Sequence, residues 1–176
     1  KIGLEKISLL ENAEELEEYC YFVAGAVGEM LCGFFINEIS GLSTQSKKIM
    51  RENAVSFGLG LQITNISKDI VVDRGRGWSY VPRTYIEANG LTPDEFHSGK
   101  SSENDLKVLN CLLNKTVGHL NDALDFILAI PRSYARIRLF CIWPLWMAME
   151  TVAKLHNNHD LLKSNANVKI PRRTVK

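Results

Sequence analysis

Apolar residues recur every three or four positions along most of this chain, and that period favours α-helix. The clearest run lies between residues 103 and 128, where the repeating positions are Leu106, Leu109, Leu113, Val117, Leu120 and Leu124. Further helices are expected over residues 11–39, 45–72, 83–89 and 135–156, with Gly- and Pro-rich loops between them. Because the alternation typical of a strand is never sustained, the sequence predicts an all-α fold.

Composition narrows the class of protein. With 45% hydrophobic residues in 176 positions the chain can bury a sizeable core, and Trp143 and Trp146 are expected in that core or in a cavity wall. A net charge of +1 gives no field that would favour nucleic acid, so no nucleic-acid partner is expected. The four cysteines lack metal-binding spacing and are expected to be free thiols in a reducing, cytoplasmic compartment. No uninterrupted apolar run reaches about 18 residues, so no membrane-spanning helix is expected.

A ridge of polar residues runs along the second long helix, in the stretch "QITNISKDIVVD". Asn65, Asp69 and Asp73 follow one another at four-residue intervals and therefore share one helical face. The surrounding residues are apolar enough for that face to be buried, where two carboxylates are costly without a cation. Oxygen ligands at this spacing suit Mg²⁺ bound to a phosphate. The alternative is an acidic patch at a helix end, paired with Lys68, Arg74 and Arg76.

Small residues gather in the first helix. Gly25 and Gly28 each cost a helix about 1 kcal/mol relative to Ala, a cost that close packing or room for a ligand usually offsets. Both explanations remain open at this point. If the glycines make room for a ligand, an apolar groove with Tyr19 at its mouth would be lined by Val23, Ala24, Val27 and Leu31. A metal–diphosphate site beside a slot for hydrocarbon is what prenyl transfer requires.

Two stretches, "YCYFVAGAVG" and "LGLQITNISKDIVVD", resemble two signatures of the squalene and phytoene synthase family. "LFCIWPLWMAMETV" and "LKSNANVKIPR" are similar to a later helix of that family and to the basic segment after it. The resemblance covers nearly the whole chain in order. It implies an isoprenoid-synthase-type helical bundle with a central cavity, and a prenyltransferase that joins two prenyl diphosphates head to head.

The resemblance also implies roles for the polar ridge. Asp69 and Asp73 match the second aspartate-rich motif, which binds Mg²⁺ bridging to a diphosphate, and Asn65 and Gln62 match polar residues that face the same cavity. Lys68 stands where the family usually has Arg, which keeps the charge and loses the two-pronged hydrogen bonding. A second usual Arg is replaced by Trp78.

The catalytic and channel positions follow in the same way. Tyr19 matches a tyrosine near the reacting carbons, with a role in proton removal or cation stabilisation, and Phe140 matches an aromatic residue that faces cationic intermediates. The remaining substrate-binding positions implied are Val23, Val27, Gly28, Leu31, Cys141 and Pro144.

The resemblance leaves the product open between squalene on the one hand and phytoene or dehydrosqualene on the other. Squalene from two farnesyl diphosphates, through a cyclopropyl diphosphate, requires NADPH, for which the implied contacts are Asn65, Lys169 and Arg172. The basic residues near the end also fit a solvated tail. A phytoene or dehydrosqualene synthase would not use NADPH. A non-catalytic helical subunit that needs a partner chain is the alternative of another class.

The family's first aspartate-rich motif is not found in the sequence. We therefore expect residues 1–176 to be the C-terminal part of a single helical prenyl synthase domain, with the N-terminal helices missing. The missing segment would lie on the same or another chain. Because the product is a hydrocarbon, the expected location is cytoplasmic, with peripheral contact with a membrane at most.

Overall fold

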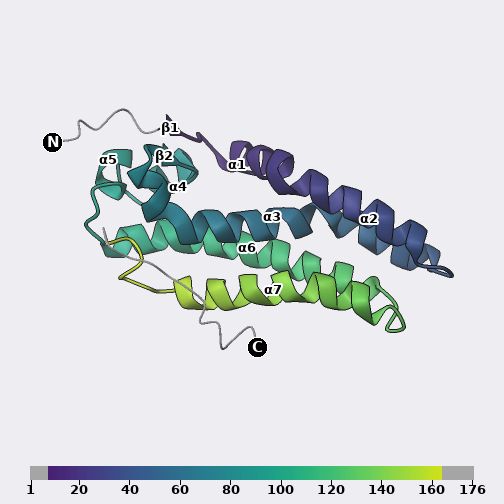
Figure 1. Cartoon of the computed structure of the whole chain (residues 1–176). Helices are drawn as coiled ribbons and strands as arrows, with labels where there is room; N and C mark the ends of the chain where they lie inside the picture. Colours follow the sequence, from purple (N-terminus) through teal and green to yellow (C-terminus); the bar gives the residue numbers. More distant parts are fainter. Residues whose placement is uncertain (1–7, 164–176) are drawn as a thin grey trace.

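The computed structural model describes residues 8–163 and confirms the all-α prediction. Four helices extend along one long direction, with α3 (Thr44–Gly75) and α6 (Glu103–Ala129) in the middle of the bundle. Figure 1 shows α2 (Ala26–Glu38) on one side of this central pair and α7 (Ala135–Leu155) on the other. The expected bounds 45–72, 103–128 and 135–156 agree with those of α3, α6 and α7 to within three residues.

Capping residues mark the starts of both central helices. The Ser43 hydroxyl accepts a hydrogen bond from the Ser46 N–H at 3.0 Å and so caps α3. Ser102 and Asp105 form a reciprocal capping box at the start of α6. Gly77 follows α3 with φ 79°, a conformation that only glycine adopts without strain.

The first helical run is not one regular helix, as residues 11–39 were expected to be. It consists of α1 (Ala13–Cys20), a π-helical turn η1 (Tyr21–Gly25) and then α2. Each π-helical turn holds more residues than an α-helical one, so the two flanking helices present different faces than an unbroken helix would. Apolar periodicity does not reveal such a turn, because a five-residue change of pitch hardly alters the pattern.

The core lies mainly between α3 and α6. Its fully buried side chains include Ile63 on α3 and Leu109, Leu112 and Ile127 on α6. Trp143 and Trp146 are 43% and 53% exposed, so the part of the prediction that placed them in the core is wrong. The apolar content of α7 is high on every face, so composition alone did not separate its packed side from its outer side.

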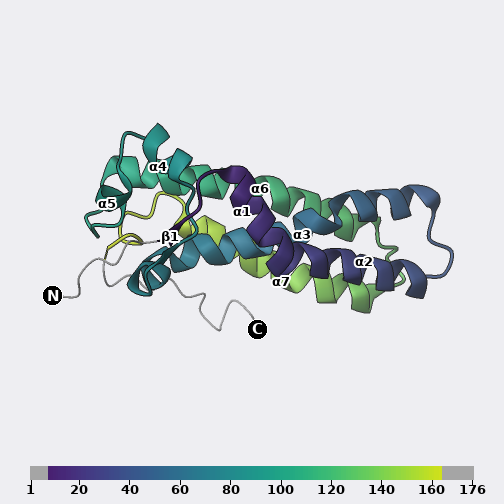
Figure 2. The same cartoon turned by 90° about the horizontal axis from the view of Figure 1, so that it is seen from above.

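Short elements gather at the end of the bundle where α3 ends (Figure 2). They are α4 (Arg83–Ala88), α5 (Pro93–Phe96) and a two-residue parallel pairing of β1 (Ser8–Leu9) with β2 (Trp78–Ser79). Neither α5 nor the strands were expected, because elements of two to four residues show no periodicity.

By length and composition, the helical run Ala13–Glu38 would also suffice to cross a membrane, in contrast to the sequence-based expectation. Packed core helices and signal sequences pass the same test. In this fold the run packs against α3, with Gly28 directly on the backbone of Ala54.

Candidate functional site

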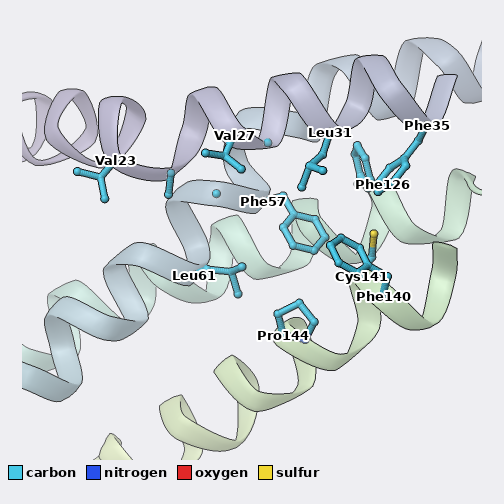
Figure 3. A pocket seen from close by; sticks show the side chains of 13 residues that line it. Val23, Val27, Leu31, Phe35, Phe57, Leu61, Phe126, Phe140, Cys141 and Pro144 are labelled. Carbon is cyan, nitrogen blue, oxygen red and sulfur yellow. The ribbon is translucent and has the colours of Figure 1, made fainter. Parts of the chain in front are cut away.

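An apolar cavity of about 290 Å³ lies between α2, α3 and α7, close to the lower end of the usual range for ligand pockets. Figure 3 shows side chains from these helices converging on it. All the apolar residues expected to bind substrate line it: Val23, Val27, Gly28, Leu31, Cys141 and Pro144. Phe140, which was expected to face cationic intermediates, lines it as well. The fold thus brings together two segments that are about 110 residues apart in sequence.

Glycines let α2 and the π-helical turn approach α3 at the wall of this cavity. A Cβ atom at Gly28 would lie 2.1 Å from the carbonyl oxygen of Ala54, and one at Gly58 would lie 2.3 Å from that of Ala24. Gly28 and Gly58 also line the cavity. Gly28 therefore permits close packing, and it also lines the groove for which the second explanation would reserve room.

Aromatic rings form one end of the cavity. Phe57 and Phe126 meet edge to face at 5.6 Å, and Phe35 lies 6.2 Å from Phe140 between ring centres. Sequence reasoning missed Phe35, Phe57, Leu61 and Phe126. Phe35 lies four residues after Leu31, so extending the expected groove by one turn would have found it. Phe126 gave no such signal, because the apolar spacing of residues 103–128 does not distinguish core positions from positions that face a cavity.

One ridge of α3 connects the cavity with the acidic residues. Phe57, Leu61, Asn65, Asp69 and Asp73 follow one another at four-residue steps. Because each step turns by about 40°, this row winds through about 160° around α3. Phe57 and Leu61 line the cavity, and the three polar residues continue the row toward the end of the helix. At 1.5 Å per residue the ridge is about 24 Å long. It is apolar at one end and carboxylate-rich at the other.

The two carboxylates are partly exposed, which corrects the expectation of a buried face. The Asp69 side chain is 39% exposed and that of Asp73 is 14% exposed, while Asn65 is exposed. The physical reason is that this side of α3 faces away from α6, its main packing partner. Burial raises the pKa of Asp73, and the neighbouring Asp69 charge raises it further. An unfavourable site for negative charge is one in which a cation is stabilising.

Two side-chain cations already contact the pair. Lys68 lies 3.1 Å from Asp69, and Arg76 lies 3.4 Å from Asp73. Part of the alternative reading therefore describes the structure correctly. Both cationic side chains are a third or more exposed, so each can turn to an anion without crossing the core.

Arg74 is not the third partner that the alternative reading required. Burial lowers the pKa of the Arg74 guanidinium, and the nearby Asp105 carboxylate opposes that shift. The positive charge of Arg74 in turn helps to lower the pKa of His97. Burial is the main cause of the low His97 pKa, which is about 4. Of the two arginines, Arg76 is the one at the acidic pair.

Tyr19 is half-buried at the end of α1, near Asp73. Its ring stacks on that of Tyr80, with centroids 4.6 Å apart and planes 25° apart. Burial and the Tyr80 hydroxyl raise the pKa of Tyr19 to about 12, and the Asp73 charge adds to this. The phenol therefore stays protonated at neutral pH.

The donor set suits a hard divalent cation that retains other ligands. Two carboxylates and one amide oxygen on adjacent turns match the way Mg²⁺ is held by few protein ligands, with water and phosphate completing its shell. Gln62 is half-buried one turn before Asn65. Within residues 8–163 no group of three His, Cys, Asp or Glu side chains could hold a metal ion by itself. Lys169 and Arg172, expected to contact NADPH, lie outside the described residues.

Cysteine chemistry plays no part in this arrangement. All four cysteines are free, as expected, and Cys20, Cys32 and Cys141 are buried. Burial raises the pKa of the Cys141 thiol to about 11, so at the cavity wall it is a neutral apolar group.

Comparison with known proteins gives consistent results. The sequence model of the squalene/phytoene synthase family matches residues 4–174. Squalene synthase of Candida albicans is 32% identical over 160 residues, which are 86% of this chain and 34% of that protein. A bifunctional lycopene cyclase/phytoene synthase of Colletotrichum graminicola is 36% identical over 123 residues, which are 69% of this chain and 21% of that protein.

Among solved structures, TcSQS in complex with the ligand BPH1237 superposes with a TM-score of 0.77 at 24% identity. The match covers 94% of this chain and 48% of that one. It confirms the expected helical fold. The chain spans 34% and 21% of the lengths of these two curated relatives and about half of this structure.

Proposed function

Because the chain belongs to the squalene/phytoene synthase family, we propose that it is part of a prenyltransferase that condenses two farnesyl diphosphates head to head into squalene. The observation that carries this proposal is the ridge of α3 from Phe57 to Asp73, which runs from an apolar cavity to a carboxylate pair. A substrate with a hydrocarbon tail and a diphosphate head fits this order of surfaces. Residues 1–176 are then the C-terminal part of one helical domain, and helices outside this sequence supply the first aspartate-rich motif.

The first step makes a cyclopropyl diphosphate. The C1–O bond of one farnesyl diphosphate breaks, and the diphosphate leaves with the electron pair. The double bond of the second molecule attacks C1 of the allylic cation, and loss of a proton from that C1 supplies the electron pair that closes the three-membered ring on the new cationic carbon. Atoms and charge balance with one diphosphate and one proton released.

The polar residues act on the leaving diphosphate. Asp69, Asp73 and Asn65 would hold Mg²⁺, which supplies positive charge to the diphosphate when bound. Lys68 and Arg76 would turn from their carboxylates to phosphate oxygens, and Gln62 would contact the same head group. A raised pKa of Asp73 fits a carboxylate that is stabilised once a cation arrives.

The apolar residues act on the hydrocarbon and the cation. The cavity wall excludes water, which would otherwise capture an allylic cation. The 60% exposed Phe140 ring and the Tyr19 ring at the head end present π-faces to positive charge. The protonated Tyr19 phenol can donate a hydrogen bond and does not add negative charge near the diphosphate.

The identity of the product is the most specific part of the proposal. Squalene requires reduction by NADPH, whereas phytoene and dehydrosqualene do not, and both squalene and phytoene synthases are among the relatives. The location proposed is cytoplasmic with peripheral membrane contact, since a hydrocarbon product partitions into lipid.

Product analysis tests the proposal. The full-length protein is incubated with farnesyl or geranylgeranyl diphosphate and Mg²⁺, with and without NADPH, and hydrocarbons are identified by gas chromatography and mass spectrometry. We expect squalene only with farnesyl diphosphate and NADPH. Phytoene or dehydrosqualene would replace the squalene assignment, and turnover that appears only with a second protein would favour the subunit alternative.

Two variants address the site itself. Asp69→Asn and Asp73→Asn should each lower kcat/KM by about 100-fold or more, the scale of losing one group that stabilises charge. Asp125→Asn removes an exposed carboxylate from α6 and should leave turnover unchanged. Full turnover in both site variants would show that the metal assignment is wrong.

A further inference from the structure

Tyr80 lies beside the proposed catalytic machinery, and neither the resemblance nor the spacing of motifs assigns it a role. Its ring is stacked on Tyr19, at a centroid separation of 4.6 Å and an interplanar angle of 25°. Offset stacking at this separation is a favoured aromatic geometry. The contact covers one face of the Tyr19 ring, so only the opposite face and the hydroxyl edge remain for a ligand.

The segment that carries Tyr80 is fastened to the residues that lead into α1. β2 pairs with β1 in parallel register, Ser8 opposite Trp78 and Leu9 opposite Ser79. Just beyond Tyr80, the Arg83 N–H donates to the Leu10 carbonyl at 2.8 Å. These bonds hold Tyr80 against the start of the helix whose last turn contains Tyr19.

Two further interactions strengthen the same connection. The Thr84 N–H donates to the Glu11 carbonyl at 3.1 Å, and the Arg83 side chain lies 3.1 Å from the Glu11 carboxylate. The segment from β2 to the start of α4 therefore follows residues 8–11 closely. Any displacement of this segment would carry the Tyr80 ring away from Tyr19.

Tyr19 needs such a support because of its place in the helix. It stands two residues before the π-helical turn η1, where the regular ladder of α-helical hydrogen bonds changes register. It is only half-buried, so packing on its own helix does not hold the ring from all sides. Asp73 at the end of α3 lies near it, and β2 begins five residues later. The chain from Asp73 to Tyr80 thus links the acidic pair to the tyrosine.

We propose that Tyr80 is a positioning residue, which fixes the orientation of the Tyr19 ring through the stack and is itself fixed by the β1–β2 pairing. This inference rests on the proposed function for its effect on catalysis, because Tyr19 is the residue placed near the reacting carbons. Tyr80 does not contact the substrate in this account. The stack turns a half-exposed phenol into one with a single open face toward the cation.

The test compares Tyr80→Leu, which removes the stacked ring, with Tyr80→Phe, which keeps it. Tyr85 on α4 is also half-buried but is not the residue stacked on Tyr19, so Tyr85→Leu and Tyr85→Phe are matched controls. In the full-length protein with farnesyl diphosphate and Mg²⁺, we expect Tyr80→Leu to lower kcat by about tenfold to 100-fold. KM should change by less than threefold, and Tyr80→Phe should retain kcat within threefold.

A second readout does not depend on activity. The ring resonances of Tyr19, assigned with a Tyr19→Phe variant of ¹³C-tyrosine-labelled protein, should shift in Tyr80→Leu because the ring current of Tyr80 is lost. They should stay close to the wild-type values in Tyr80→Phe and in both Tyr85 variants. If Tyr80→Leu does not fold, Tyr80→Gln takes its place.

The outcomes are distinguishable. Wild-type kcat in Tyr80→Leu, an equal loss in Tyr85→Leu, or unchanged Tyr19 resonances would each overturn the positioning role. If the wild-type protein forms no condensation product, the proposed function fails instead, and the resonances alone then decide whether Tyr80 fixes Tyr19.

Discussion

Replacing Gly28 by alanine should separate α2 from α3 and destabilise the protein. The added Cβ atom would lie 2.1 Å from the Ala54 carbonyl oxygen, whereas ordinary contact begins at 3.4 Å, so the helices must move apart by about 1.3 Å (3.4 − 2.1). The obstacle is backbone and cannot rotate away. Overpacking typically costs about 1–3 kcal/mol, and alanine returns up to about 1 kcal/mol through helix propensity. We expect a net loss of about 2 kcal/mol.

Gly33, on the same helix, is the matched control. A Cβ atom there meets nothing within 4 Å, so Gly33→Ala should stabilise the protein by up to about 1 kcal/mol. Urea denaturation of both full-length variants, followed by circular dichroism, gives the two free energies of unfolding. The reasoning is refuted if Gly28→Ala is as stable as the wild type, or if both variants change stability in the same direction.

Three further predictions concern charge. His97 has a folded pKa of about 4 against an ordinary 6.5, so the unfolded state binds more protons between these values, and stability should fall by about 2 kcal/mol from pH 8 to pH 5. Urea titrations should show a flatter pH dependence in His97→Gln; an equal slope would contradict this. Burial and the neighbouring Asp69 charge raise the pKa of Asp73. Protonation of Asp73 should therefore weaken Mg²⁺ binding, measured by calorimetry, at a higher pH than protonation of an aspartate with an ordinary pKa would. Asp69→Asn should move that weakening to lower pH, and no movement would argue against the coupling. Lys68→Arg, which can donate two parallel hydrogen bonds to one phosphate, should lower KM for farnesyl diphosphate two- to fivefold with kcat unchanged, and a raised KM would count against a phosphate contact.

Periodicity predicted the long helices and one wall of the apolar cavity, and the resemblance to the family supplied Phe140, Cys141 and Pro144 on another wall. Val23, Val27 and Leu31 repeat at four-residue steps, so their common face could be identified without a structure. Phe126 could not be assigned to that cavity, because which helix covers a groove depends on tertiary packing. The Tyr19–Tyr80 stack was hidden for the same reason, since it depends on a two-residue strand pairing.

The electrostatics of the site were predicted in part. The shared face of Asp69 and Asp73 followed from helix geometry alone. Their exposure did not, because an apolar neighbourhood in sequence does not reveal which side of a helix another helix covers. The pairing with Lys68 and Arg76, and the turning of Arg74 toward the interior, likewise depend on side-chain directions in the folded chain.

Binding of a non-ionising substrate analogue tests the central claim most directly. Titration calorimetry of farnesyl thiodiphosphate into the full-length protein, with and without Mg²⁺, measures the head site apart from turnover. We predict Mg²⁺-dependent binding that weakens at least 100-fold when Asp69→Asn and Asp73→Asn are combined, with Asp125→Asn unchanged. Equal affinity in the wild type and the double variant would contradict the claim that these two aspartates hold the metal–diphosphate group.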